Sequence, residues 1–329
     1  MISLPLHRVA TVLPYIAYMQ QQGVQVEDEL RRANLPVSAM YDPGCFIPSR
    51  NYWDFIANVA EREGMKDLGF IVGLQSGANA ADLGLTKRLM RLPTLHEALN
   101  QFCTIASAEI SQVALWLEPS DKNNHHLHYR TSYGIEHPAY VHFQWYGLMA
   151  LIAVIRIFTG GLWQPKQIGL GTNKEPSLSI RKYIPDTHFY LKQEHCFISI
   201  SKRLLGKPLK VKDDLPQSLP YNPGIKVPGD FIGRIKLALR SYLMDSVPTL
   251  KLVADITGLS TRTLQRQLAN NGLTYRDLLA EVRCETAIEL MQKTNLTITD
   301  IASQLGYSDG AHFARNFRRI TGVSPHEYI

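Results

Sequence analysis

The chain has few cysteines and no cysteine pairs. Its 329 residues include four, Cys45, Cys103, Cys196 and Cys284, and no two of them form a CxxC motif. This spacing argues against a zinc ribbon or a disulfide framework, and isolated reduced thiols suit a cytosolic protein. Catalytic signatures are missing as well, because no serine–histidine–aspartate set and no pair of carboxylates has a spacing that indicates an enzyme.

Long uninterrupted apolar runs are also missing. The longest, residues 146–163, is broken by Arg156 and by the pair Gly160–Gly161. It is too short to span a bilayer, so it is predicted to be a buried core helix. The first twenty residues carry polar breaks and two prolines, which is unlike a secretory signal. We therefore expect a soluble, cytoplasmic protein with no membrane partner.

Positive charge is not concentrated in one part of the chain. The net charge is +6, from 35 basic and 29 acidic residues. Residues 230–329 hold 12 basic and 10 acidic residues, and the remainder holds 23 and 19. Net charge alone therefore does not identify a nucleic-acid partner, and any such case depends on where the basic residues are placed.

The length suits two domains, and the pattern of elements changes along the chain. Residues 1–209 mix helical periodicity with strand-like runs, including a hairpin around residues 120–124, a long helix over 138–159 and strands near 166–172 and 188–201. Residues 210–229 contain four prolines and two glycines, which is typical of a linker. Residues 230–329 show seven helical patterns and no strand signal. The fold class is thus an α+β N-terminal domain over 1–209, a linker over 210–229 and an all-α C-terminal domain over 230–329.

Two stretches within the helical part repeat one pattern. Residues 253–268, VADITGLSTRTLQRQL, match residues 301–317, IASQLGYSDGAHFARNF, with one extra residue in the second stretch. In each, an alanine precedes a glycine by four residues, a serine follows the glycine by two, and two large apolar residues stand four apart. The members are Ala254, Gly258, Ser260, Leu264 and Leu268 in the first copy and Ala302, Gly306, Ser308, Phe313 and Phe317 in the second.

This pattern is typical of a helix-turn-helix motif. The alanine lets two helices cross closely, the glycine supplies the left-handed residue of the turn, and the serine caps the second helix. The apolar pair buries one stripe of that helix and turns other side chains outward: Arg262, Gln265 and Arg266 in the first copy and His312, Arg315 and Asn316 in the second. Arginine, glutamine and asparagine are the side chains that read base edges in the major groove. Arg276, Arg318 and Arg319 are expected to contact phosphates.

Residues 230–329 resemble the DNA-binding domain of the AraC/XylS family of bacterial transcription regulators. The resemblance is carried by the two helix-turn-helix units, the connecting helix YRDLLAEVRCETAIELM and the closing motif GYSDGAHFARNFRRITGVSPHEY. It implies that both second helices enter successive major-groove segments on one face of double-stranded promoter DNA. Gly310 and Ala311 stand where many members carry longer side chains, so the second helix is expected to anchor while the first reads much of the sequence.

Residues 1–209 more loosely resemble the sensor domain of one AraC subgroup, which includes regulators of ornithine and arginine utilisation. The matching features are DLGFIVGLQSGANAADLGLTKRLMRLPTLHEALNQF and the long central helix. The resemblance implies a non-cupin domain that binds a small-molecule effector, whose identity stays open. His142, Trp145 and Tyr146, near the start of the long helix, are candidate pocket residues, with ordinary core packing as the alternative.

Two other features receive structural interpretations. Arg283 in the connecting helix is expected to pack between the two helix-turn-helix units. The cluster His125, His126 and His128 has no acidic or cysteine partner nearby in the sequence, so an exposed hairpin loop is expected in place of a metal site. No metal and no cofactor are predicted.

The expected function is that of a sequence-specific DNA-binding regulator controlled by an effector, and not of an enzyme. A homodimer through the N-terminal domain is possible, as is contact with RNA polymerase if the protein is an activator. Two alternatives stay open: a metabolic enzyme with a DNA-binding tail, and an architectural DNA binder without an effector. The sequence does not distinguish activation from repression.

Overall fold

A computed structural model describes residues 4–76, 89, 91–109, 113–131, 134–208 and 227–328. The chain divides into two compact units: unit 1 contains residues 1–55 together with 227–329, and unit 2 contains residues 56–226. This division differs from the expected one, because the first 55 residues group with the C-terminal helices. Most of the expected linker, residues 210–226, lies outside the described residues.

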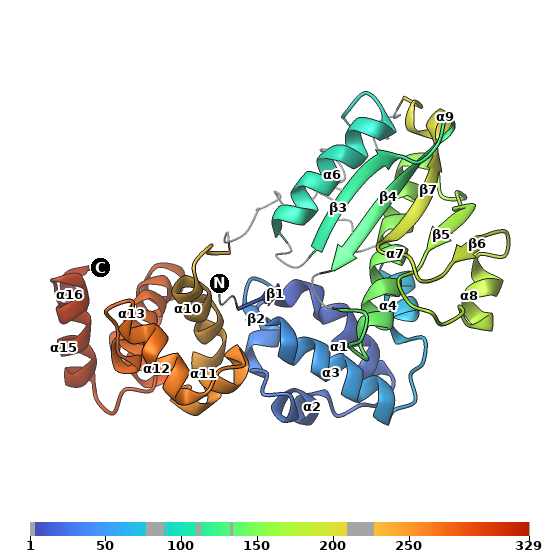
Figure 1. Ribbon diagram of the computed structural model, residues 1–329. Helices are drawn as coiled ribbons and strands as arrows, with labels where there is room; N and C mark the ends of the chain where they lie inside the picture. Colours follow the sequence, from blue (N-terminus) through green and yellow to red (C-terminus); the bar gives the residue numbers. More distant parts are fainter. Residues whose placement is uncertain are drawn as a thin grey trace. The chain divides into compact units, whose positions relative to one another are not determined.

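Unit 2 is built on a five-stranded sheet in the order β3-β4-β7-β5-β6 (Figure 1). Strands β3 (Val113–Pro119) and β4 (Asn124–Thr131) form the predicted antiparallel hairpin. The strands predicted near 166–172 and 188–201 are β5 (Gln167–Gly169), β6 (His188–Tyr190) and β7 (Cys196–Ser201). Strands β6 and β7 do not pair with each other, because β5 lies between them, parallel to β6 and antiparallel to β7.

Among the described residues, the helices that accompany this sheet are α4 (Leu68–Ser76), α6 (Leu95–Glu109), α7 (Tyr140–Thr159), α8 (Leu178–Tyr183) and α9 (Lys202–Leu205). Helix α7 is the core helix that the apolar run predicted, and its buried side includes Leu148, Ile152 and Ile155. Among the described helices it alone has the length and apolar composition to cross a membrane, and most of it is buried inside the protein.

The glycine run beginning at Gly69 serves helix packing. A Cβ atom on Gly69 would lie 1.8 Å from the carbonyl oxygen of His142, and one on Gly73 would lie 2.8 Å from the Cβ of Met149. Helices α4 and α7 can therefore approach this closely only with glycine at these positions. Gly77 and Gly84, which belong to the same run, lie outside the described residues.

The N-terminal part of unit 1 contains a short ribbon and several helices. Strands β1 (Leu6–Arg8) and β2 (Phe46–Pro48) pair antiparallel, and between them lie η1 (Val9–Thr11), α1 (Leu13–Gln21), α2 (Val26–Arg32) and η2 (Ser38–Tyr41). Helix α3 (Ser49–Arg62) begins in unit 1 and ends in unit 2.

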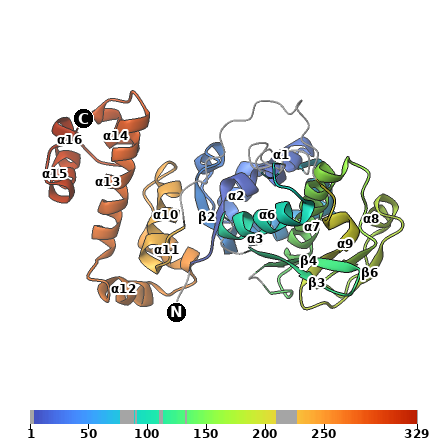
Figure 2. The same cartoon turned by 90° about the horizontal axis from the view of Figure 1, so that it is seen from above.

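The C-terminal part of unit 1 contains the seven predicted helices: α10 (Phe231–Leu243), α11 (Leu250–Thr257), α12 (Thr261–Ala269), α13 (Tyr275–Lys293), α14 (Ile298–Gln304), α15 (Gly310–Thr321) and α16 (Pro325–Tyr328). The long helix α13 separates the first helix-turn-helix pair, α11 and α12, from the second, α14 and α15 (Figure 2).

Helix α10 explains why the first 55 residues belong to unit 1. Leu4, Leu6 and Phe46 are buried in the same hydrophobic core as the helices α10 to α15. Hydrogen bonds reinforce this packing: the Ser241 hydroxyl donates to the carbonyl oxygen of Phe46 at 2.7 Å. The carboxylate of Asp245 accepts from the backbone N–H groups of residues 37 and 38 at 2.5 and 2.8 Å. These contacts link residues about 200 positions apart, which the pattern of the sequence does not reveal.

Candidate nucleic-acid interface and ligand cavity

The first helix-turn-helix unit has the predicted local structure. Helix α11 ends at Gly258, whose φ is +70°, and the N–H of Leu259 donates to the carbonyl oxygen of Ala254 at 3.0 Å. The Ser260 hydroxyl then accepts from the N–H of Thr263 at 3.2 Å and caps α12. A left-handed residue and a side-chain cap together satisfy the backbone groups that both helix ends leave open.

The second unit departs from the first at its cap. The turn again uses a left-handed glycine, Gly306, with φ +73°. However, the cap of α15 is Asp309 and not the predicted Ser308, because the extra residue of the second copy moves the helix start by one position. The Asp309 carboxylate accepts from the N–H of His312 at 2.6 Å, and the Ser308 hydroxyl donates to the other carboxylate oxygen at 3.1 Å.

The apolar pairs orient both second helices as predicted. Leu264 and Leu268 are buried in α12, and Phe313 and Phe317 are buried in α15 with their ring centroids 5.6 Å apart. The side chains between these positions face away from the core. In α12 the exposed residues include all three predicted base-contacting residues: Arg262, Gln265 and Arg266.

In α15 the predicted base-contacting residues differ in their exposure. Arg315 is exposed, whereas His312 and Asn316 are half-buried. The ring of His312 packs edge-on against Tyr307 at a centroid distance of 5.4 Å, and the Asn316 side-chain amide donates to the carbonyl oxygen of His312 at 3.4 Å. His312 and Asn316 therefore make contacts within the unit, and Arg315 is the most exposed of the three side chains.

All three residues predicted to contact phosphates are exposed: Arg276, Arg318 and Arg319. Arg319 also forms an ion pair across two helices, with its Nη1 3.6 Å from a carboxylate oxygen of Asp277. Asp277 belongs to the capping box that begins α13. This ion pair therefore links α15 to the start of α13.

Arg283 was expected to pack between the two helix-turn-helix units, and its contacts run from the connecting helix to the second unit. Its Nη2 donates to the carbonyl oxygen of Gly306 at 3.2 Å, and its guanidinium lies 4.8 Å from the centroid of the Tyr307 ring. Burial lowers the pKa of Arg283, although a guanidinium stays charged at any physiological pH. The connecting helix thus holds the turn of the second unit directly.

The connecting helix is in turn fixed to α10 by a ladder of ion pairs. Lys236 contacts Glu281 at 2.6 Å and Glu285 at 3.2 Å, and Arg240 contacts Glu285 and Glu289 at 2.8 Å each. The two cations are 23% exposed, so solvent screens these contacts less than it screens ordinary surface pairs. This network positions α13, and with it the spacing of the two helix-turn-helix units.

The three candidate pocket residues, His142, Trp145 and Tyr146, lie in unit 2 and mostly face its interior. His142 and Trp145 are buried, and Trp145 packs edge-on against Phe70 at 6.2 Å. Burial lowers the pKa of His142 to about 4. None of the three lines the cavity beside the first turn of α7 or the cavity on the opposite face of the sheet.

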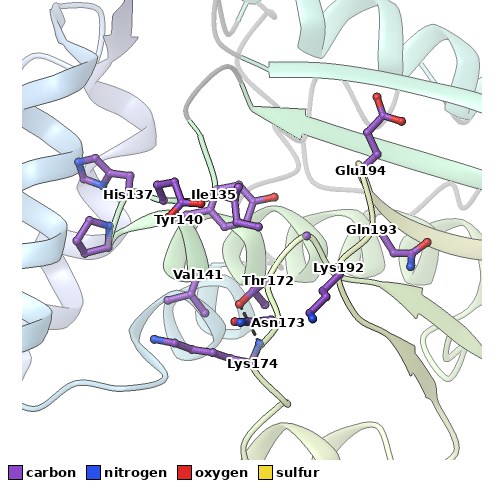
Figure 3. A pocket seen from close by; sticks show the side chains of 13 residues that line it. Ile135, His137, Tyr140, Val141, Thr172, Asn173, Lys174, Lys192, Gln193 and Glu194 are labelled. Atoms are coloured by element: carbon purple, nitrogen blue, oxygen red, sulfur yellow. Dashed lines mark hydrogen bonds between the residues drawn. The ribbon is translucent and has the colours of Figure 1, made fainter.

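A cavity of about 630 Å³ lies beside the first turn of α7, where Tyr140 and Val141 line it (Figure 3). Its wall is formed by the turn before α7, by residues 171–174 after β5 and by residues 192–194 before β7. The charged side chains on the wall are Glu136, Lys174, Lys192 and Glu194. Its volume is in the range of small-molecule sites.

One feature of the sequence points toward this cavity. The long helix is predicted to begin near residue 138, and the turn before it and the loops next to neighbouring strands are candidates for a shared wall. Which loops meet there depends on β5 lying between β6 and β7. That strand order could not be read from the sequence.

Two helix-turn-helix units on one connecting helix, with basic and polar side chains on the exposed edges of α12 and α15, define a DNA-binding module of the kind used by transcription regulators. Comparisons with known families agree with the geometry. Residues 253–329 match a helix-turn-helix domain. Residues 23–209, more than half of the chain, match the N-terminal arabinose-binding domain of the AraC transcription regulator. The chain belongs to the AraC family of transcription regulators.

Individual relatives match over shorter stretches. The HTH-type transcriptional regulator VqsM of Pseudomonas aeruginosa is 39% identical over 95 residues, which is 29% of each chain. The ornithine utilization regulator of the same organism is 37% identical over 81 residues, which is 25% of this chain and 24% of that protein. The chain thus covers less than a third of the length of either relative. Among solved structures, the transcriptional regulator CdpR from P. aeruginosa is 19% identical, with a TM-score of 0.39 over 92% of this chain and 96% of that chain.

Proposed function

We propose that this AraC-family regulator binds promoter DNA through both helix-turn-helix units and responds to a small molecule bound in unit 2. The arrangement of α12 and α15 carries the first half of the proposal. Each helix buries one apolar stripe and exposes a polar edge, and one helix, α13, connects the two units. Two such edges suit two major-groove segments of one DNA duplex.

The residues divide into two roles. In α12, Arg262, Gln265 and Arg266 read base edges, because their side chains offer bidentate donors and acceptors and all three are exposed. In α15, Arg315 reads bases, with His312 and Asn316 in a lesser part. Arg276, Arg318 and Arg319 contact phosphates, which orient the protein on the duplex without specifying sequence.

The effector site is the cavity beside the first turn of α7. Its volume and its mixed wall of carboxylates, lysines and amides suit a small polar molecule. The protein acts by binding and catalyses no reaction in this proposal. Its compartment is the cytoplasm, where bacterial promoter DNA lies. A second copy of the chain and, for an activator, RNA polymerase are its further partners.

A selection from random duplex DNA with the full chain tests the DNA-binding part. We expect an enriched site with two conserved segments about one helical turn apart and an affinity that falls steeply with salt. Retention of DNA without any enriched sequence would favour the architectural binder. In the same preparation, turnover of a metabolite by the full chain would favour the enzyme.

A further inference from the structure

A second cavity, of about 480 Å³, lies on the face of the five-stranded sheet that is turned away from α7. Side chains alternate along each strand. Leu127 and Ile198 belong to the hydrophobic core with α7, so their neighbours His128 and Phe197 lie on the opposite face. His125, His126 and His128, which were expected in a hairpin loop, are all part of β4, so that expectation was wrong. His126 and His128 are half-buried on this face, whereas His125 lies on the other face.

Aromatic rings and one glycine form a single row across all five strands of this face. Strand pairing aligns Trp116 with His128, His128 with Phe197, Phe197 with Gly169 and Gly169 with Tyr190. A Cβ on Gly169 would lie 2.2 Å from the Phe197 ring, so the glycine leaves room for that ring to lie across β5. The row is thus a continuous aromatic surface beneath the cavity.

Stacking keeps these rings in place. The indole of Trp116 stacks on the imidazole of His128, with centroids 4.8 Å apart and an interplanar angle of 7°. The ring of His126, from the next position along β4 on the same face, stacks on Phe197 at 3.9 Å and 8°. At the edge of the row the guanidinium of Arg130 lies 5.9 Å from the Trp116 centroid. This face already holds one cation of the protein against an aromatic ring.

The charged groups on the cavity wall are acidic. Glu118, Asp121 and Glu194 line it, and no lysine or arginine is among the described residues that do so. His126 and His128 do not offset these charges at neutral pH, because burial lowers the pKa of each. The faces of the aromatic rings add further negative potential. The cavity therefore favours a positively charged occupant.

His128 holds the Glu118 carboxylate beside the cavity. Its Nε2 lies 2.9 Å from a carboxylate oxygen of Glu118. Its Nδ1 is buried and has no hydrogen-bond partner in the described part of the chain, and the side chain is only 12% exposed. The contact with Glu118 is therefore partly shielded from solvent on the histidine side.

We propose that this cavity is a binding site for an organic cation, a primary amine or guanidinium attached to a flat or apolar body. The body lies against the rings of His126 and Tyr190, and the charge lies between the carboxylates of Glu118 and Glu194. This site is distinct from the effector cavity beside α7, although both include Gln193 and Glu194. Binding of a cation at this site does not depend on the proposed DNA binding.

Three probes of one shape and different charge test the site: 2-phenylethylamine, 2-phenylethanol and phenylacetate. Calorimetric titration of the full chain at neutral pH is expected to give the amine the lowest Kd in the series. The alcohol is expected to bind about tenfold more weakly, since it keeps the stacking and loses the charge. Phenylacetate should be weakest. Phenylacetate binding as tightly as the amine, or no amine binding in the millimolar range, would overturn the proposal.

Variants locate the binding. Glu118 lines this cavity and not the one beside α7. The variant Glu118→Gln keeps side-chain shape, and it should weaken the amine about threefold or more while leaving the alcohol unchanged. The control Glu136→Gln makes the same charge change in the other cavity and should leave the amine unchanged. An unaltered amine Kd in Glu118→Gln, with the thermal midpoint unchanged as a check of folding, would contradict the assignment to this cavity.

Discussion

The guanidinium of Arg283 lies 4.8 Å from the ring centroid of Tyr307, and its Nη2 also donates to the carbonyl oxygen of Gly306. One side chain of the connecting helix thus holds both the turn of the second helix-turn-helix unit and the aromatic residue that follows it. A Cβ on Gly306 would lie 2.4 Å from Val247 and 3.2 Å from Arg283, so the turn is enclosed by these neighbours as well as left-handed.

Replacing Arg283 should therefore loosen the second unit without removing a DNA contact. We expect Arg283→Ala to lower the free energy of unfolding by about 1–2 kcal/mol, through loss of the ring contact and the hydrogen bond. Weaker binding should be confined to the DNA segment read by α15. The control Lys293→Ala changes an exposed cation at the end of the same helix. Equal losses in the two variants would refute the positioning role.

Arg266 and Arg318 should differ in what they contribute to DNA binding. Arg266→Ala is expected to weaken binding to the preferred site by about 1–3 kcal/mol and to relax discrimination at one base pair. Arg318→Ala should weaken binding about equally on all sequences and reduce the slope of affinity against salt by about one ion. Fluorescence anisotropy on the selected site and on single-base variants separates the two patterns. If Arg266→Ala binds the selected site with unchanged affinity, Arg266 does not read a base.

The position of the α15 cap can be tested by two neighbouring substitutions. Asp309→Ala removes the side chain that accepts from the N–H of His312, and it should cost about 1 kcal/mol of stability. Ser308→Ala should cost only a few tenths, because that hydroxyl contacts the cap and not the helix backbone. Urea unfolding of both variants gives the comparison. A larger cost for Ser308→Ala would restore the serine cap that the sequence repeat suggested.

Acid should destabilise unit 1 through His7. Burial lowers the pKa of His7 to about 4 from its ordinary 6.5, and its Nδ1 lies 2.6 Å from the Ser49 hydroxyl. Between these pH values the unfolded chain binds more protons than the folded one, so stability is full above 6.5 and falls as the pH drops toward 4. The loss attributable to His7 is roughly 3 kcal/mol.

His7→Gln should remove this part of the pH dependence, measured as the difference in unfolding free energy between neutral and acid pH. The control His326→Gln changes a histidine that is exposed on α16. A wild-type pH profile in His7→Gln would mean that other groups, among them buried His142, carry the acid sensitivity.

The grouping of the N-terminal residues with the C-terminal helices gives a fifth prediction. Phe46→Ala removes a buried ring from the core that contains α10, and it should cost about 3–5 kcal/mol. Amide exchange should then accelerate in α10. Tyr41→Ala, which changes a ring that is 80% exposed in the same segment, should leave α10 unaffected. Unaltered exchange in α10 of Phe46→Ala would argue for the simpler division at the linker.

The local structure of the helical part followed closely from the sequence. The glycine turns, the buried stripes of α12 and α15 and the outward arginines of α12 all depend on spacings of a few residues, which a single sequence displays directly. The cap of α15 was misplaced, because the choice between Ser308 and Asp309 depends on one inserted residue and on the geometry that it produces. The contacts that His312 and Asn316 make within the second unit could not be predicted from the sequence either.

The sequence by itself determined the seven helices, the two helix-turn-helix units and the central apolar helix, since each is encoded by periodicity and capping within one segment. Only the tertiary structure decided which residues share a core and which share a cavity. Phe46 meets α10 across almost 200 residues, and Trp116, His128, Phe197 and Tyr190 form one row only because β5 lies between β6 and β7. Such neighbours are selected by the packing free energy of the whole chain, and no local pattern specifies them.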